Sequence, residues 1–267
     1  MTTLAVPRTI RAVWLRPDVS FLAVRVWQRN RDVFMNIWKS EAIWPFVEPM
    51  LMVVVLGFLA DFINLDNQED YIQFFGPGII AGYAMWIASA EACWGAYFRM
   101  DQKTFDAIIS TPASVDDVST GEVMWASTRS LLSVFGNFIV LLAFGAFTSI
   151  TAALILPVAI LPGLMFGAIG MCYTAVARSV SSLNYFFATY ITPQFWLSGA
   201  FFPLDEMPGW VEVIAWFTPA YHVVRPYRAL SSGEVDYTVA IDIAWMLVVG
   251  IVAYLAALHL MRRRLIK

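Results

Sequence analysis

Six apolar stretches, each about 20 residues long and joined by short connections, constrain this sequence most. A stretch of that length crosses the ~30 Å hydrocarbon layer of a bilayer as a helix. Only 14% of the residues are charged, whereas soluble domains carry about 25%. We therefore expect an all-α polytopic membrane protein, with a single transmembrane domain over residues 1–267. The six predicted spans run approximately over Ser40–Ala60, Phe74–Phe98, Gly121–Phe147, Thr151–Ala177, Leu183–Phe202 and Val239–Met261.

The positions of Lys and Arg predict the orientation, because cytosolic loops of membrane proteins are enriched in these residues. If both termini are cytosolic, all of the 17 Lys and Arg residues except Arg129, Arg225 and Arg228 fall on the cytosolic side. The predicted outer loop Asp61–Tyr71 contains four acids and no base. Arginines also interrupt the first residues, so no signal-peptide core is expected. The sequence predicts that both termini lie in the cytosol.

Three segments outside the spans carry further predictions. Residues 19–37 mix large apolar side chains with arginines and predict an amphipathic helix at the cytosolic interface, the alternative being an ordinary soluble helix. Residues 99–120 form an inner loop, in which Thr104 is expected to cap a short helix that ends at the Thr111–Pro112 step. Residues 203–236 are too broken to span and too apolar to be solvated, which favours a re-entrant hairpin between the fifth and sixth spans.

Three ionisable residues are predicted to lie at one depth inside the membrane. Glu48, Glu91 and Arg129 each lie eight or nine residues from the cytosolic end of their span, or ~12 Å into the bilayer. Such groups are costly in a membrane and face partners or water. We hypothesise a polar node in which Arg129 pairs with Glu48, Glu91 or both; the alternative is that each faces a wet cavity separately. Asp242 falls at the outer edge of the sixth span and is expected to be solvated.

The chain lacks the motifs of several catalytic and cofactor-binding classes. None of its three lysines follows a glycine, so no P-loop for ATP exists. His222 and His259 lie far apart, and Cys93 and Cys172 show no metal-ligand spacing. We expect no enzyme, no metal site, no cofactor bound by this chain and no nucleic-acid partner.

Small and aromatic residues mark two of the spans. Gly163, Gly167 and Gly170 give the fourth span a face for close helix packing. The fifth span is rich in aromatic residues, many of which are expected in the core or at the membrane interfaces. Some are candidates to line a path for a sugar- or lipid-bearing substrate: Tyr185, Phe187, Tyr190 and Trp196.

Three sequence motifs follow one another along the chain. The first is Tyr71–Ile80 (YIQFFGPGII), the second is Thr111–Glu122 (TPASVDDVSTGE), and the third is Leu197–Trp210 (LSGAFFPLDEMPGW), continued by TPAYH and a late Arg. In this order they resemble the motifs of the type-2 ABC exporter permeases, although Ala113 replaces the family's usual Leu. Within this family, three shorter segments are most similar to the nodulation-factor (lipooligosaccharide) export permeases: Ala90–Met100, Lys103–Ile109 and Gly121–Ala126.

The resemblance implies a division of labour between subunits. Two copies of the chain would form a path through the inner membrane of a bacterium, and two cytosolic P-loop ATPase subunits would hold ATP and Mg. The inner loop would be the coupling element that docks on the ATPase, through Thr104, Phe105, Asp106, Ile109, Thr111 and Pro112. The outer hairpin would be the external gate, with Pro203, Pro208, Trp210, Pro219, His222 and Arg228.

The function implied is export of a lipid-linked or amphipathic glycan, such as a lipooligosaccharide or polysaccharide. Two alternatives stay open at the level of sequence. One is an ABC exporter of drugs or other lipids. The other is an ion- or proton-coupled secondary transporter that uses Glu48, Glu91 and Arg129 as a relay.

Overall fold

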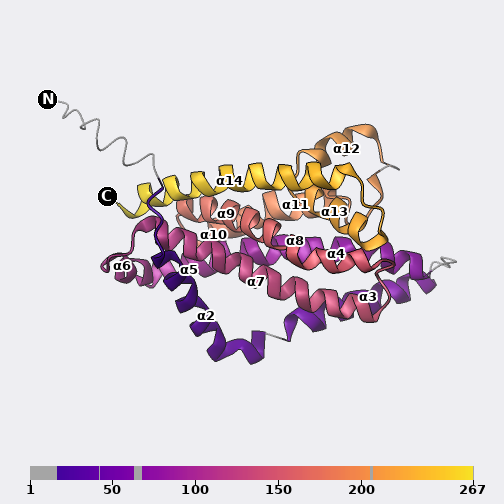
Figure 1. Ribbon diagram of the computed structural model, residues 1–267, viewed down its shortest axis with the longest axis horizontal. Coiled ribbons are helices and arrows are strands. Elements are labelled where there is room, and N and C mark those ends of the chain that lie inside the picture. The colour runs from indigo at the N-terminus through magenta and orange to yellow at the C-terminus, as the bar shows by residue number, and fades with distance from the viewer. Residues whose placement is uncertain (1–16, 42, 63–67, 205–206, 267) are drawn as a thin grey trace.

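The protein forms an elongated bundle of helices (Figure 1). The computed structural model describes residues 17–41, 43–62, 68–204 and 207–266, and side chains other than those of residues 56–71. Within these ranges every regular element is a helix. The prediction of an all-α protein is confirmed, whereas the arginines before residue 17 and the acids of the predicted outer loop lie outside the described side chains.

Four helical segments are long and apolar enough to cross a membrane: Ile72–Asp101, Val115–Ala143, Ile150–Val176 and Tyr237–Leu265. They correspond to the second, third, fourth and sixth predicted spans. The first segment joins α4 (Gln68–Ala90), the π-helix η1 (Glu91–Gly95) and α5 (Ala96–Asp101). The second is α7 (Val115–Ala143) and the last is α14 (Tyr237–Leu265). The third joins η2 (Ile150–Leu154), α8 (Ile155–Val158) and α9 (Ile160–Val176).

The other two predicted spans are shorter or more broken than expected. Residues 40 and 41 belong to α2 (Leu22–Glu41), and the helix of the first predicted span, α3 (Trp44–Phe62), begins after them. The fifth consists of α10 (Val180–Phe186), the π-helix η3 (Phe187–Ile191) and α11 (Thr192–Leu197). It ends five residues before the predicted boundary, because the chain turns at Gly199, whose φ of 79° is left-handed.

Two predicted connections are also corrected. The inner loop is shorter than residues 99–120, because α7 begins at Val115 and leaves only α6 (Thr104–Ile109) and two turns. A capping box at Ser114 starts α7 early. Residues 148–150, which separate the third and fourth predicted spans, are part of a longer connection that is held on another helix: the amides of Thr148 and Ser149 both donate to the Ser231 carbonyl.

Helix α9 packs closely on its neighbours through its glycine face, as the sequence predicted. A Cβ at Gly163 would lie 2.7 Å from the Ser127 hydroxyl of α7, and one at Gly170 would lie 2.9 Å from the Ala92 methyl group of η1. Both distances are too short for a real Cβ, so only glycine permits this approach. Helix α9 consequently lies at the centre of the bundle, against α4, α7 and α14.

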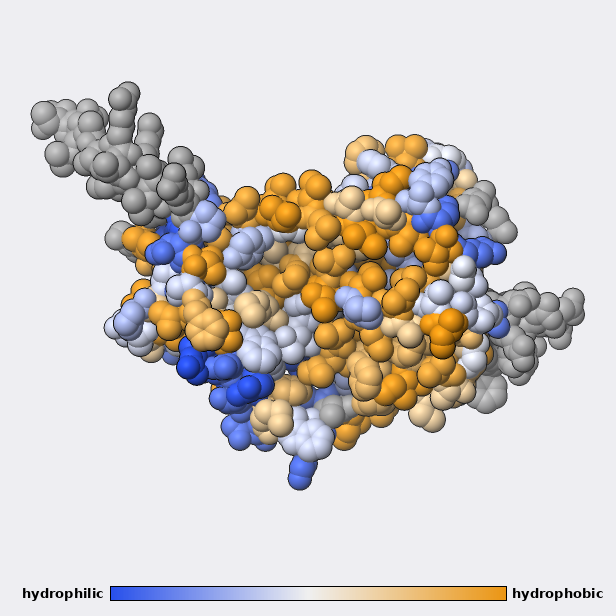
Figure 2. Space-filling view, viewed as in Figure 1, coloured by the Kyte–Doolittle hydropathy of each residue, from blue (hydrophilic) through white to orange (hydrophobic). Residues whose placement is uncertain are grey.

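The two ends of the bundle differ. The start of α2, helix α6 and the end of α14 lie at one end, and α12 (Gly209–Trp216) and α13 (Tyr221–Ser232) lie at the other (Figure 1). The middle is covered largely by hydrophobic residues in the view of Figure 2, with hydrophilic residues toward the ends. On α14 the exposed apolar side chains include Val248, Ile251 and Val252. A band of this kind suits the hydrocarbon core of a bilayer.

Candidate functional sites along the bundle

Helix α6 is anchored by one side chain and presents others to solvent. Phe105 is fully buried, in an apolar cluster with Val26 and Val118, whereas Asp106 is exposed. Lys103, in a left-handed conformation with φ 62°, precedes the helix and takes the N-cap position that was predicted for Thr104. The helix ends at Ile109, before the predicted Thr111–Pro112 step.

The predicted coupling residues therefore differ in their exposure. Asp106, Thr111 and Pro112 are exposed, and Thr104 and Ile109 are half-buried. Phe105 faces the interior of the protein, so it can position a docking surface but cannot form one.

Hydrogen bonds and an ion pair join the first turn of α7 to the segment before α2 and to the end of α14. The Ser20 amide donates to Asp117 Oδ1 at 2.6 Å, and the Asp18 amide donates to Asp116 Oδ2 at 2.7 Å. Arg262, near the end of α14, forms an ion pair with Asp116 in which its Nε lies 2.7 Å from Oδ1. Movement of α6 and its adjoining turn is thus linked mechanically to α2 and α14.

Sequence reasoning assigned no role to Asp116 and Asp117. Asp117 also closes the capping box with Ser114, the two hydrogen bonds measuring 2.9 and 3.0 Å. The spacing of Ser114 and Asp117 is a helix-start signal that was present in the sequence. It would have placed the beginning of α7 correctly.

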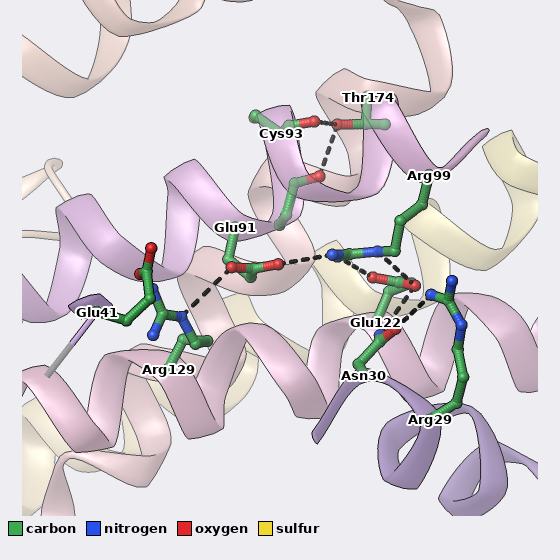
Figure 3. Close-up of polar contacts among 10 residues, drawn as sticks. Arg29, Asn30, Glu41, Glu91, Cys93, Arg99, Glu122, Arg129 and Thr174 are labelled. Carbon is green, nitrogen blue, oxygen red and sulfur yellow. Dashed lines mark hydrogen bonds and ion pairs between the residues drawn. The ribbon is translucent and has the colours of Figure 1, made fainter. Parts of the chain in front are cut away.

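A chain of ion pairs crosses the half of the bundle nearer α6 (Figure 3). Arg129 of α7 lies between two carboxylates, bonding Glu41 at the end of α2 and lying 3.5 Å from Glu91 Oε2. Arg99 of α5 bonds the other oxygen of Glu91 at 2.9 Å and Glu122 at 2.5 Å. The predicted pairing of Arg129 with Glu91 is confirmed, and these two residues do not face separate wet cavities.

Glu48 is not part of this polar node, so that part of the prediction is wrong. The chain bends between α2 and α3, which brings Glu41 rather than Glu48 to Arg129. Glu48 lies about two helical turns further along. It lies instead beside Tyr83, and the two residues line the same cavity. Sequence reasoning also missed Arg99 and Glu122, although both lie in the segments that carry the family resemblance.

Polar side chains of α2 adjoin the same chain of ion pairs. Asn30 donates to Glu122 Oε1 at 3.1 Å and accepts from Arg29 at 2.9 Å. The pKa of the Arg29 guanidinium is lowered, first because burial removes water from the charged group, while the nearby Glu122 opposes this shift. The predicted interfacial helix is thus fixed to the bundle through its polar face.

The π-helix η1 places Glu91 in this network. A π-helix leaves backbone carbonyls without their usual partners, and such segments occur often at functional sites. The Thr174 hydroxyl of α9 donates to the Ala92 carbonyl at 2.7 Å, and the Cys93 thiol donates to the Gly170 carbonyl at 3.5 Å. Cys93 is therefore a buried packing residue.

At the opposite end, a charged cluster joins α13 to α14. Asp242 was predicted to be solvated, but it is fully buried. Its carboxylate accepts a hydrogen bond from Arg225 Nε at 2.7 Å and faces His222 Nδ1 at 2.7 Å. The other ring nitrogen of His222 lies 2.7 Å from the Trp216 carbonyl. The two ring nitrogens of His222 thus lie against the Asp242 carboxylate and the Trp216 carbonyl, which fixes the orientation of the ring between α13 and α14.

The predicted gate residues are spread over this end. Arg228 lies over the Phe74 ring at 3.8 Å and donates to the Gly199 carbonyl, and with Pro203 it lines a cavity of about 160 Å³. His222 and Pro219 are buried, whereas Pro208 and Trp210 are exposed. The structure brings Arg228 and Pro203 to one cavity but places Trp210 on the surface.

The four candidate path aromatics do not form one surface. Phe187 is buried and stacks on Trp94, with ring centroids 4.1 Å apart. Tyr190 is half-buried and stacks on Phe186. Tyr185 and Trp196 are exposed. Phe187 is thus a core residue of the single chain, and a substrate path along these aromatics stays a prediction.

A comparison with known sequences decides the family. Residues 22–230 match the family described as ABC-2 type transporter. The chain belongs to this family. It is thus a multi-pass permease of an ABC transporter, and family membership implies an ATPase partner subunit in a membrane environment.

Individual relatives cover nearly the whole chain. Nodulation protein J of Rhizobium leguminosarum bv. trifolii is 29% identical over 253 residues, which are 94% of this chain and 97% of the relative. Nodulation protein J of Rhizobium leguminosarum bv. viciae is 30% identical, covering 91% and 94%. The inner membrane transport permease YadH of Escherichia coli K12 is 19% identical, covering 89% and 93%. The predicted family and the resemblance to the nodulation proteins are confirmed.

Proposed function

We propose that this ABC-2 permease forms the transmembrane part of an ATP-driven exporter that moves an amphipathic or lipid-linked glycan out of the cytoplasm. The observation that carries the proposal is the match to the family over residues 22–230, together with similarity to nodulation protein J along almost the whole chain. The name of the YadH relative, an inner membrane transport permease, supports placement in the inner membrane of a bacterium.

The arrangement in the membrane has six spans with both termini in the cytosol. In this proposal α3 and the α10–η3–α11 segment cross beside the four longer segments. Helices α12 and α13 form a re-entrant outer hairpin, which is supported by the buried residues of α13 and its contacts with α4 and α14. Basic residues near α6 and the end of α14 support a cytosolic location for that end.

Coupling to ATP hydrolysis runs through α6. Two permease copies rest on two ATPase subunits, which hold ATP and Mg, and the exposed side of α6 docks on one of them. ATP binding closes the ATPase pair and pushes α6, and the buried bonds of Asp116 and Asp117 pass that motion to α2 and α14. The binding energy of ATP thereby shifts the population of inward- and outward-facing states.

A proton-coupled secondary transporter is less favoured by the charge arrangement. The predicted relay needs Glu48, Glu91 and Arg129 to pass a proton between them, but Glu91 is held by two guanidinium groups and Glu48 forms no ion pair with a described Lys or Arg. An exporter of drugs or other lipids stays an alternative within the same family.

Purification tests the proposal. The chain is extracted from its native membrane in a mild detergent, and accompanying proteins are identified by mass spectrometry. A soluble P-loop ATPase in nearly equal amount is expected. A folded, dimeric chain with no such ATPase would contradict the proposal and favour gradient-driven transport.

A further inference from the structure

A cavity of about 730 Å³ lies where α2 and α3 meet beside α4 and α7. In Figure 1 these two helices meet at an angle below α7. The volume falls within the range of small-molecule sites, about 300–1,000 Å³. Its walls are rich in aromatic side chains: Phe34, Trp38, Trp44, Phe46, Tyr83, Trp86, Phe135 and Phe195.

The charge available to a ligand in this cavity is negative. Its charged lining residues are Glu41, Glu48 and Arg129. Arg129 is already engaged, since it bonds Glu41, lies 3.5 Å from Glu91, and lies over the ring of Phe34 at 4.6 Å. An anionic headgroup would therefore have to displace a protein carboxylate to reach this guanidinium.

Glu48 differs from the other two charged residues. It lies beside Tyr83 on the cavity wall, and among the described residues no ion pair within 4.0 Å joins it to a Lys or Arg. A carboxylate has room for about four hydrogen bonds. The side chain is exposed on the cavity wall. It can therefore accept a donor from a ligand without breaking an ion pair in the described structure.

The aromatic walls also favour a cation as the ligand. An indole face attracts a cation within ~6 Å of its centre, and aromatic cages are a known way to bind quaternary ammonium groups. Trp38, Trp44 and Trp86 line this cavity, and all three are also partly open to the surface of the chain. A ligand with an apolar body can enter here from the hydrocarbon side.

We propose that this cavity binds an amphipathic monocation, a single ammonium or phosphonium centre carried on an apolar body, with the charge next to Glu48. The carboxylate supplies electrostatic attraction and the aromatic walls hold the body. The proposal goes beyond the export function, because it concerns a ligand site within one copy and does not depend on the ATPase or on the transported glycan.

The test uses two probes of nearly identical shape and opposite charge. Binding of radiolabelled tetraphenylphosphonium is measured on the purified chain in nanodiscs of a neutral lipid, after subtraction of empty nanodiscs. Unlabelled tetraphenylborate is the competitor of matched size. We expect saturable binding of tetraphenylphosphonium and no competition by tetraphenylborate.

Two variants locate the site, with a third as the matched control. Glu48→Gln keeps the size and removes the charge, and is expected to weaken binding about tenfold, because a hydrogen bond or contact with a charged group contributes on this scale. Trp38→Leu keeps an apolar wall and removes an indole face, and is expected to weaken binding about threefold. Glu234→Gln, at an exposed position near the opposite end, is expected to bind as the parent does.

Several results would overturn the inference. They are unchanged binding in Glu48→Gln, equal competition by tetraphenylborate, or no saturable binding above that of empty nanodiscs. If Glu48→Gln fails to fold, unchanged binding in Trp38→Leu would overturn it independently. None of these results depends on whether an ATPase copurifies, so failure here is distinct from failure of the export proposal.

Discussion

Arg99 is the residue on which the chain of ion pairs depends most. Its guanidinium bonds Glu91 on one side and Glu122 on the other, and the Glu122 side chain is only 1% exposed. Removing one partner of a buried ion pair leaves an uncompensated charge and costs about 3–5 kcal/mol. Arg31, whose pair with Asp32 is largely exposed, offers a contrast, since such pairs contribute about 0–1 kcal/mol.

Arg99→Gln is therefore expected to lower the thermal stability of the purified chain strongly, whereas Arg31→Gln leaves it nearly unchanged. The measurement is a thermal unfolding curve in the same detergent for both variants and the parent. Equal, small shifts in the two variants would show that the buried network contributes little.

Gly78 joins two of the sequence motifs at a single contact. It lies in FFGPGII of α4, and a Cβ there would lie 2.6 Å from the carbonyl oxygen of Ala200, in the SGAFFP segment. Because the neighbouring atoms belong to the backbone, they cannot move aside as a flexible side chain would. The two motifs thus meet in space, which explains why a glycine is needed at that place.

Gly78→Ala is expected to destabilise the chain, although alanine is the better helix former by about 1 kcal/mol. Gly209→Ala is the matched control, because a Cβ at Gly209 meets nothing within 4 Å. Thermal unfolding of both variants checks the sign. A stabilised Gly78→Ala variant would contradict the close approach of α4 to the SGAFFP segment.

At the residue scale, sequence reasoning predicted a contact correctly where the depth of the two residues along their helices determined the pairing. Glu91 and Arg129 lie at one depth on neighbouring helices and pair as predicted. The predicted place of Glu48 in the polar node was wrong because its position depends on the bend between α2 and α3, which no local sequence pattern specified. The prediction that Asp242 is solvated was wrong because its partners, His222 and Arg225, lie on α13, whose packing against α14 cannot be deduced from residue spacing.

Helix α6 is the element that carries the proposed docking surface for the ATPase. Phe105 holds it to the bundle, and Asp106 faces outward. The side chain that anchors α6 and the side chain proposed to contact the ATPase are thus adjacent. Substituting each one separately distinguishes a loss of stability from a loss of coupling.

Asp106→Arg is expected to leave thermal stability unchanged and to abolish coupling, so that ATP hydrolysis by the reconstituted complex no longer drives transport. Phe105→Ala is expected to cost about 3–5 kcal/mol in unfolding free energy, because it leaves a cavity in a buried cluster. Unfolding curves and the ratio of transport to hydrolysis measure the two effects. Normal coupling in a folded Asp106→Arg variant would count against α6.

Element types were predictable from the sequence, and element ends were less so. Long apolar runs identified the helices, because hydropathy over about 20 residues is a strong signal. Ends depended on local bonds instead: the capping box at Ser114 and the left-handed turn at Gly199 moved two boundaries. The π-helices η1 and η3 have no recognisable sequence signal and were missed.

The whole molecule is polarised along its length. Helix α6 and the basic end of α14 lie at one end, and the α12–α13 pair lies at the other (Figure 1). Counting Lys and Arg on each side of the predicted spans indicated this asymmetry, because such a count needs only the order of spans and loops. It did not predict the cavity beside α3, which depends on three-dimensional packing.

The orientation predicts opposite labelling of two engineered cysteines. A membrane-impermeant maleimide applied to spheroplasts is expected to label Glu234→Cys at once and Lys103→Cys only after permeabilisation. Both positions are exposed, whereas the native Cys93 is buried and Cys172 is partly buried. Labelling of Lys103→Cys in intact spheroplasts would reverse the proposed orientation.

The most direct test of the account is a photo-crosslink from α6 to the ATPase. A photoreactive phenylalanine analogue replaces Asp106 in one variant and Glu234 in another, and each complex is irradiated after mild extraction. The account predicts an adduct with a P-loop ATPase from position 106 and none from position 234. An ATPase that copurifies without an adduct at position 106, or one that crosslinks at position 234, would contradict it.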